Sequence, residues 1–110
     1  MFAMDGSGSV SVSTWKLALD FVKTFAESIT FGRNETRIGL LTFSSNASVK
    51  ALLGQYSDVS KFCSLVQETP YLEQSTNASR AIYCARTEIF SLEGNIYSFF
   101  TCCIEWNLFL

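Results

Sequence analysis

Apolar residues recur every three or four positions between residues 10 and 31, which is the spacing of one face of a helix. Charged residues fall on the opposite side of the same helix. The pattern predicts one long amphipathic helix, capped by Ser11 or Ser13 and ended by Gly32 and Asn34. The apolar positions expected to face the core are Trp15, Ala18, Leu19, Val22, Phe25, Ala26 and Ile29.

Three further runs predict strands. Residues 1–4 are apolar throughout and stop at Asp5. Residues 36–43 contain a denser run from Ile38 to Phe43, in which Thr42 is the only polar side chain. Strands of this kind are buried on both faces, as in parallel sheets. Residues 48–53 follow after a turn that is too short for a crossover, so we expect them to pair antiparallel with the preceding strand.

Two more helices follow. One begins at Ser57 or Asp58 and ends near Glu68, before Pro70, with Val59, Phe62, Cys63 and Val66 on its apolar face. The other follows residue 77 and carries Ala78, Ala81, Ile82, Ala85 and Ile89 on one face. The alternation of strands and helices predicts an α/β fold. We expect a Rossmann-like open sheet, mostly parallel with one antiparallel edge hairpin, and helices on both faces.

The composition narrows the classes of function. A chain of 110 residues with 48% hydrophobic content can form one small domain with a core. A net charge of -2 provides no electrostatic footprint for nucleic acid or for an anionic membrane. The chain has no histidine, which excludes Ser–His and Cys–His nucleophilic pairs and H-E-x-x-H zinc sites. No spacing of lysines or carboxylates indicates catalysis, so we predict that the protein is not an enzyme.

The cysteines and glycosylation motifs bear on the compartment. The four cysteines lack the spacing of a zinc site, and buried free thiols fit their pattern as well as a disulfide does. Three N-x-S/T sequons begin at Asn34, Asn46 and Asn77. We therefore expect an extracellular or cell-surface glycoprotein. Residues 1–4 are too short for a signal peptide, so we expect the chain to be a piece of a longer protein.

Candidate chemistry concentrates directly after the first predicted strand, in Asp5-Gly6-Ser7-Gly8-Ser9. Ligands of α/β sheets bind outside the carboxyl ends of parallel strands. The two serines are two positions apart, so in an extended loop both side chains can point to one side. The two glycines allow backbone angles and close approach that a Cβ would forbid. One carboxylate and two hydroxyls are hard oxygen donors, which suit Mg²⁺.

This loop resembles the D-x-S-x-S loop of von Willebrand factor type A domains, a family that includes integrin inserted domains and matrix proteins. In that family the loop belongs to a metal-ion-dependent adhesion site, and an acidic residue of a protein partner completes the metal shell. The resemblance implies that Ser7 and Ser9 ligate the ion. It implies that Asp5 holds the ion through water.

The resemblance also implies a metal-binding role for Thr76, just before the third predicted helix. In the family a threonine at this place supplies another hydroxyl to the ion. Ala78 and Ser79 stand where the family often has a second threonine and a glycine. The alternative is that Ser75, Thr76 or Asn77 caps the helix.

The resemblance covers residues 1–92 and breaks in residues 93–110. The family continues with a strand that ends in Thr-Asp-Gly, whose aspartate holds the metal from the far side. No Asp-Gly follows here, and Glu105 is the only carboxylate side chain after Gly94. We therefore expect a partial, truncated domain followed by a divergent apolar tail, in which residues 96–106 form a replacement strand beside residues 1–4. The tail is too short and too interrupted by polar residues to span a membrane.

The sequence thus predicts a divalent-cation-dependent protein-binding module of cell adhesion or the extracellular matrix. The ion would be Mg²⁺, Mn²⁺ or Ca²⁺, held by Asp5, Ser7, Ser9 and Thr76. The partner would be an extracellular matrix or cell-surface protein that offers an acidic residue. The alternative is a metal-free structural or interaction fragment, because the far-side aspartate is missing. A third interpretation, a phosphate cradle at a helix start, is opposed by Asp5 and by the lack of a lysine in the loop.

Overall fold

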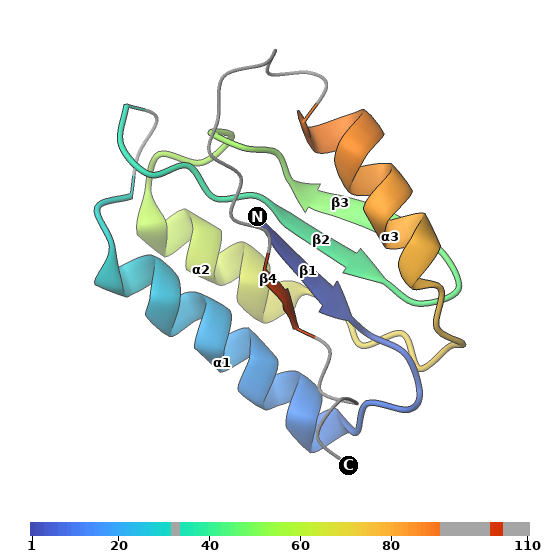
Figure 1. Cartoon of the computed structure of the whole chain (residues 1–110). Coiled ribbons are helices and arrows are strands. Elements are labelled where there is room, and N and C mark those ends of the chain that lie inside the picture. The colour runs from blue at the N-terminus through green and yellow to red at the C-terminus, as the bar shows by residue number, and fades with distance from the viewer. Residues whose placement is uncertain (32–33, 91–101, 105–110) are drawn as a thin grey trace.

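The computed structural model describes residues 1–31, 34–90 and 102–104. Four strands form one sheet in the order β3-β2-β1-β4 (Figure 1). β1 (Phe2–Asp5) lies between β2 (Leu40–Phe43) and β4 (Cys102–Ile104) and is parallel to both. β3 (Ala47–Ala51) pairs antiparallel with β2. These pairings confirm a mostly parallel sheet with one antiparallel edge hairpin.

β4 lies at the edge beside β1, where the sequence predicted a strand of residues 96–106. Phe2 pairs with Cys102, and Met4 pairs with Ile104. The rest of the predicted strand, including Glu105, lies outside the described residues. The division of the chain at residue 92 stays a prediction.

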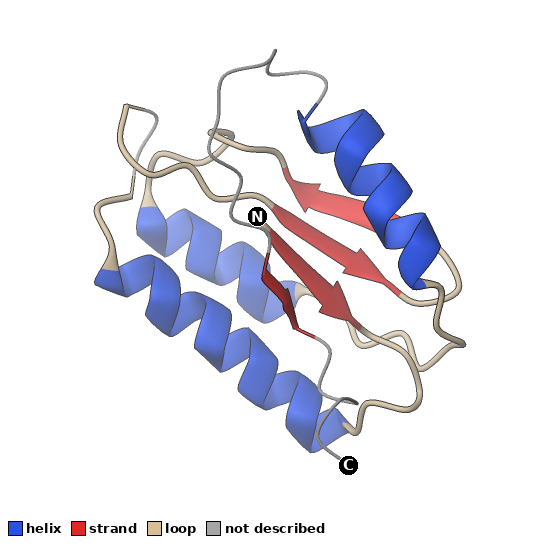
Figure 2. Ribbon diagram, viewed as in Figure 1, coloured by secondary structure: helices blue, strands red, loops and turns tan. Residues whose placement is uncertain are grey.

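The helices cover both faces of the sheet (Figure 2). α1 (Val12–Ser28) and α2 (Val59–Glu68) lie on one face. α3 (Ala78–Cys84) lies on the other face and continues into the π-helical turn η1 (Ala85–Phe90). None of the described helices is long and apolar enough to cross a membrane.

Successive residues of β1 enter two separate cores. Phe2 and Met4 pack with the buried side chains of α1 and α2, and Ala3 packs with those of α3 and η1. Side chains alternate between the faces of a strand, so a strand covered on both faces must be apolar at every position. This explains why residues 1–4 contain no polar side chain.

The first helix is shorter than predicted. α1 is capped by Ser11, whose Oγ accepts the N–H of Thr14 at 3.2 Å, but it ends at Ser28 rather than at Gly32. Ile29 is extended, with φ -115° and ψ 162°. β-branched residues favour this conformation. The N–H of Thr36 also donates to the carbonyl of Thr30 at 3.1 Å.

The predicted core face of the third helix is wrong at one position. Ile82 is 65% exposed, whereas Ala81 and Ala85 are buried. The small side chains of these alanines let the helix approach the sheet closely along the face that they share. Ile82 is rotated about 100° from Ala81 around the helix axis and therefore points away from that contact.

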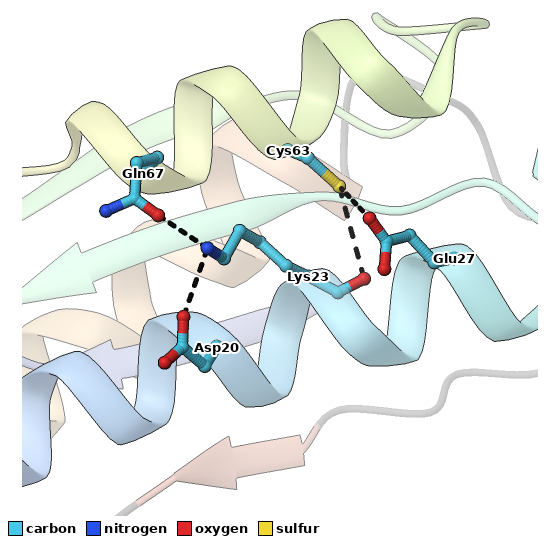
Figure 3. A network of polar contacts seen from close by, with 5 residues as sticks. All are labelled: Asp20, Lys23, Glu27, Cys63 and Gln67. Atoms are coloured by element: carbon cyan, nitrogen blue, oxygen red, sulfur yellow. Dashed lines mark hydrogen bonds and ion pairs between the residues drawn. The ribbon is translucent and has the colours of Figure 1, made fainter.

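A polar network joins α1 to α2 (Figure 3). Lys23 forms an ion pair with Asp20 at 3.0 Å and donates to Oε1 of Gln67. The Sγ of Cys63 lies 4.0 Å from Oε1 of Glu27. Burial raises the pKa of the Cys63 thiol, as does Glu27, while Lys23 lowers it. Cys63 is thus a free thiol at the contact between the two helices, one of the two states that its pattern in the sequence allowed.

Candidate metal centre

Asp5 ends β1, and its carboxylate lies inside the molecule, with 4% of the residue exposed. Oδ1 accepts a hydrogen bond from the backbone N–H of Ser7 at 2.9 Å. Oδ2 is buried and has no hydrogen-bond partner among the described residues. A buried carboxylate oxygen without a partner is costly in free energy, and a cation or its bound water would remove that cost. Asp5 therefore fits the role that the resemblance implies.

Ser7 and Ser9 point to the same place. Their hydroxyl oxygens lie 2.9 Å apart and share a hydrogen bond. Ser7 is 1% exposed, while Ser9 is exposed. The expectation that both side chains point to one side of the loop is confirmed. The pair places two neutral oxygen donors side by side, one inside the molecule and one at its surface.

The predicted need for glycine in this loop is wrong. Among the described glycines only Gly54 has a positive φ. A Cβ on Gly6 would lie 3.5 Å from the ring of Trp15, and a Cβ on Gly8 would lie 3.4 Å from the carbonyl oxygen of Glu73. These are ordinary van der Waals distances. The unusual backbone angle lies in the facing segment instead, where Glu73 has φ 55°.

The 71–77 segment runs alongside the 5–9 loop. The N–H of Gly8 donates to the carbonyl of Gln74 at 2.7 Å, and the N–H of Glu73 donates to the carbonyl of Gly6 at 3.0 Å. These bonds form an isolated parallel bridge between Ser7 and Gln74. Two segments that are far apart in the sequence thus meet at the carboxyl end of β1.

Gln74 also ties this segment to the turn between β2 and β3. Its Oε1 accepts from the hydroxyls of Ser44 at 3.0 Å and Ser45 at 2.8 Å. In the sequence both serines lie in the short turn between two predicted strands, and nothing there indicates a role for Gln74. A polar turn and a distant glutamine carry no signal of their pairing, so the sequence alone could not identify this contact.

Tyr71 also anchors the 71–77 segment to the 5–9 loop. Its hydroxyl donates to the carbonyls of Ser7, at 3.2 Å, and Val10. Burial raises the pKa of Tyr71, and the negative charges of Glu73 and Asp5 raise it further. The phenol therefore stays neutral and remains a donor at physiological pH.

Thr76 lies between two anchored residues. Gln74 is bonded to Gly8 as described, and the N–H of Asn77 donates to the carbonyl of Ser44 at 2.8 Å. The side chain of Asn77 caps α3, since its Oδ1 accepts from the N–H of Arg80 at 3.1 Å. The cap thus falls to Asn77, and Thr76 is exposed.

The donors gathered here determine which ion fits. Asp5, Ser7 and Ser9 come together, and the segment that carries Thr76 lies beside them. In the described part of the chain, no three His, Cys, Asp or Glu side chains cluster in a way that could hold a metal ion. A cation at this site would therefore rest on hydroxyls and a single carboxylate. Such hard oxygen donors suit Mg²⁺, Mn²⁺ or Ca²⁺.

Comparison with known proteins identifies the family and its setting. The model of the von Willebrand factor type A domain matches residues 1–96. The chain is 36% identical over 92 residues to the transmembrane cell adhesion receptor mua-3 of Caenorhabditis elegans, a match that covers 83% of this chain and 2% of that protein. It is 27% identical over 82 residues to matrilin-1 of Gallus gallus, which covers 74% of this chain and 17% of that protein.

A third relative is integrin alpha-X of Mus musculus, 31% identical over 94 residues that cover 86% of this chain and 8% of that protein. The chain thus spans only a small part of each relative. The relatives are matrix or cell-surface proteins, in agreement with the predicted extracellular or cell-surface location.

Solved structures confirm the fold. The proximal thread matrix protein 1 of the mussel byssus superposes with a TM-score of 0.73 at 23% identity, over 81% of this chain and 24% of that chain. Another structure of that protein, with a zinc-occupied MIDAS motif, has a TM-score of 0.71 at 24% identity, with the same coverage of both chains.

Proposed function

Because the chain belongs to the von Willebrand factor type A domain family, we propose that it binds a protein partner through a divalent cation. The cation would be held by Asp5, Ser7, Ser9 and Thr76. The observation that carries the proposal is the buried, unpartnered Oδ2 of Asp5, which lies in the same loop as the paired hydroxyls of Ser7 and Ser9.

The charge of the donor set favours an anionic partner group. Hydroxyls are neutral, so among the four donors only Asp5 offsets the charge of a divalent ion. The bound cation would supply a remaining positive charge and an open coordination position, which suit a carboxylate of another protein.

The partner we propose is an extracellular matrix or cell-surface protein that presents an acidic side chain. The matrix and adhesion relatives support this class of partner, and the zinc-occupied MIDAS motif of the mussel protein supports a divalent cation. Binding without catalysis is also in keeping with the absence of histidine from the chain.

Calorimetric titration with Mg²⁺ tests the proposal. The wild-type chain should release or absorb heat with a saturable isotherm, and Asp5→Asn should weaken Mg²⁺ binding by at least about tenfold. Asparagine retains an oxygen for the N–H of Ser7, so the loop keeps its hydrogen bond while it loses the charge.

The matched control is Asp20→Asn, which removes an exposed carboxylate of α1 that forms an ion pair with Lys23, away from the candidate site. This variant should bind Mg²⁺ as the wild type does. Equal binding by Asp5→Asn and the wild type would contradict the proposed site.

The metal-free alternative remains the competing function, because the described donors include one carboxylate and no Asp-Gly follows residue 92. A folded wild-type chain that produces no heat with Mg²⁺, Mn²⁺ or Ca²⁺ would favour it. Partner binding that EDTA leaves unchanged would favour it as well.

A further inference from the structure

Two N-glycosylation sequons meet at one backbone residue. The N–H of Ser44 donates to the carbonyl of Asn46 at 2.8 Å, and the carbonyl of Ser44 accepts from the N–H of Asn77 at 2.8 Å. Ser44 thus holds together two asparagines that are far apart in the sequence. Both asparagines and the serines that complete their sequons, Ser48 and Ser79, are exposed.

The third sequon lies elsewhere. Asn34 belongs to the loop between α1 and β2, which leads into the amino end of β2, whereas Asn46 belongs to the turn that follows the carboxyl end of this strand. Figure 1 shows that loop and that turn at opposite ends of the sheet. Only Asn46 and Asn77 therefore lie at the end that carries the 5–9 loop.

The helix-capping role of Asn77 is compatible with modification. Glycan transfer forms a bond between Nδ2 of asparagine and the anomeric carbon of a lipid-pyrophosphate-linked oligosaccharide. The bond from that carbon to the pyrophosphate oxygen breaks, the lipid pyrophosphate leaves with the electron pair, and Nδ2 loses one proton to solvent. The cap uses Oδ1, which the transfer leaves as an acceptor for the N–H of Arg80.

We propose that Asn46 and Asn77 both carry N-linked oligosaccharides, which form a screen along one flank of the 5–9 loop. The screened flank is the one formed by the 71–77 segment. Gln74 of this segment faces the loop and also binds Ser44 and Ser45. N-linked glycans are bulky and hydrated and occupy the solvent beside their attachment points. The screen leaves the 5–9 loop open to a protein partner that approaches from the side where α1 begins. Its consequence for partner access rests on the proposed function.

The first test measures glycan occupancy on the full chain, secreted from a eukaryotic host behind a cleavable leader. Ser48→Ala removes the Asn46 sequon, and Ser79→Ala removes the Asn77 sequon while the asparagine cap stays intact. Each variant should lose the mass of one oligosaccharide. Thr36→Ala, which removes the Asn34 sequon, serves as the control at the far end of the sheet. A wild-type chain without a glycan on Asn46 or on Asn77 would overturn the proposal.

The second test measures the screen without a partner. Ser75→Cys places a thiol on the exposed 71–77 segment, outside the proposed donor set. We measure the rate at which this thiol reacts with a maleimide on a large polyethylene glycol, divided by its rate with N-ethylmaleimide. This rate ratio should be several-fold lower than in the same protein with both Ser48→Ala and Ser79→Ala. The background rate of the native cysteines is measured without Ser75→Cys and subtracted. Thr36→Ala should leave the ratio unchanged.

Equal rate ratios with and without the two glycans would overturn the screen. Neither test requires a bound cation. A negative Mg²⁺ titration would therefore refute the proposed metal site without affecting the glycan screen. Equal rate ratios would refute the glycan screen without affecting the metal site.

Discussion

Two buried side-chain oxygens in the described part of the chain have no hydrogen-bond partner, and their surroundings differ. Oδ2 of Asp5 belongs to a loop with two further oxygen donors, one of them at the surface. Oγ1 of Thr42 lies in β2, opposite Met4 of β1, with 1% of the residue exposed. We interpret the first as a ligand-binding atom and the second as an uncompensated cost within the sheet.

The cost at Thr42 should be measurable. Thr42→Val keeps the branched shape and removes an unpaired hydroxyl, so we expect the free energy of unfolding to rise by about 1 kcal/mol in urea denaturation. Thr69→Val is the matched control, because the buried Thr69 hydroxyl donates to the carbonyl of Leu65 at 2.9 Å. In this control the free energy of unfolding should fall by about 1 kcal/mol. Destabilisation by Thr42→Val would mean that its hydroxyl has a partner after all.

Tyr71 predicts how stability changes at high pH. Its pKa in the folded state is raised from 10.0, so the folded chain retains a proton that the unfolded chain releases. The resulting stabilisation is fully present below pH 10.0 and declines as the pH rises through the folded-state pKa. Urea unfolding at pH 8 to 11 should show a steeper loss of stability for the wild type than for Tyr71→Phe. Parallel curves would contradict this role of Tyr71.

At the scale of elements, the capping residues were the most predictable feature. Ser11 and Asp58 cap α1 and α2, and both were among the candidates that the sequence offered. A polar side chain before an apolar periodic run has a local function, so its role can be recognised locally. The end of α1 could not be predicted in the same way, because the extended Ile29 competes with a nearby glycine as a stop signal.

The cap of α3 leads to a prediction for this element. Asn77→Ala removes the acceptor for the N–H of Arg80 and should lower the free energy of unfolding by about 1 kcal/mol. Asn77→Asp keeps an acceptor, so its free energy of unfolding should fall by much less. Both variants lack the sequon, so the comparison is made on unglycosylated protein from a bacterial host. Equal loss in both variants would show that the cap contributes nothing.

At the scale of the whole molecule, the sheet topology brings the candidate site together. The 5–9 loop follows β1, the turn with Ser44 follows β2, and both strands are parallel, so both segments leave the same end of the sheet. The 71–77 segment then crosses between them through Gly8, Ser44 and Ser45. The site is thus a product of the parallel pairing of β1 with β2.

The sequence therefore anticipated the end of the sheet at which the site lies, but not how its parts are held. Asp5, Ser7 and Ser9 were recognisable because they are neighbours in one loop. Gln74 and Tyr71 were not, because each bonds to segments that only the folded topology brings near. Such long-range contacts leave no periodic pattern in a single sequence.

Cation binding by the 5–9 loop can be tested by a titration with Mn²⁺, followed through the paramagnetic broadening of backbone amide signals in two-dimensional NMR spectra. Amides of residues 5–9 and 74–77 should broaden first, those of residues 34–36 at the far end should stay sharp, and Asp5→Asn should abolish the selective effect. Broadening that begins at exposed carboxylates such as Asp20, or that is the same in Asp5→Asn, would contradict the account.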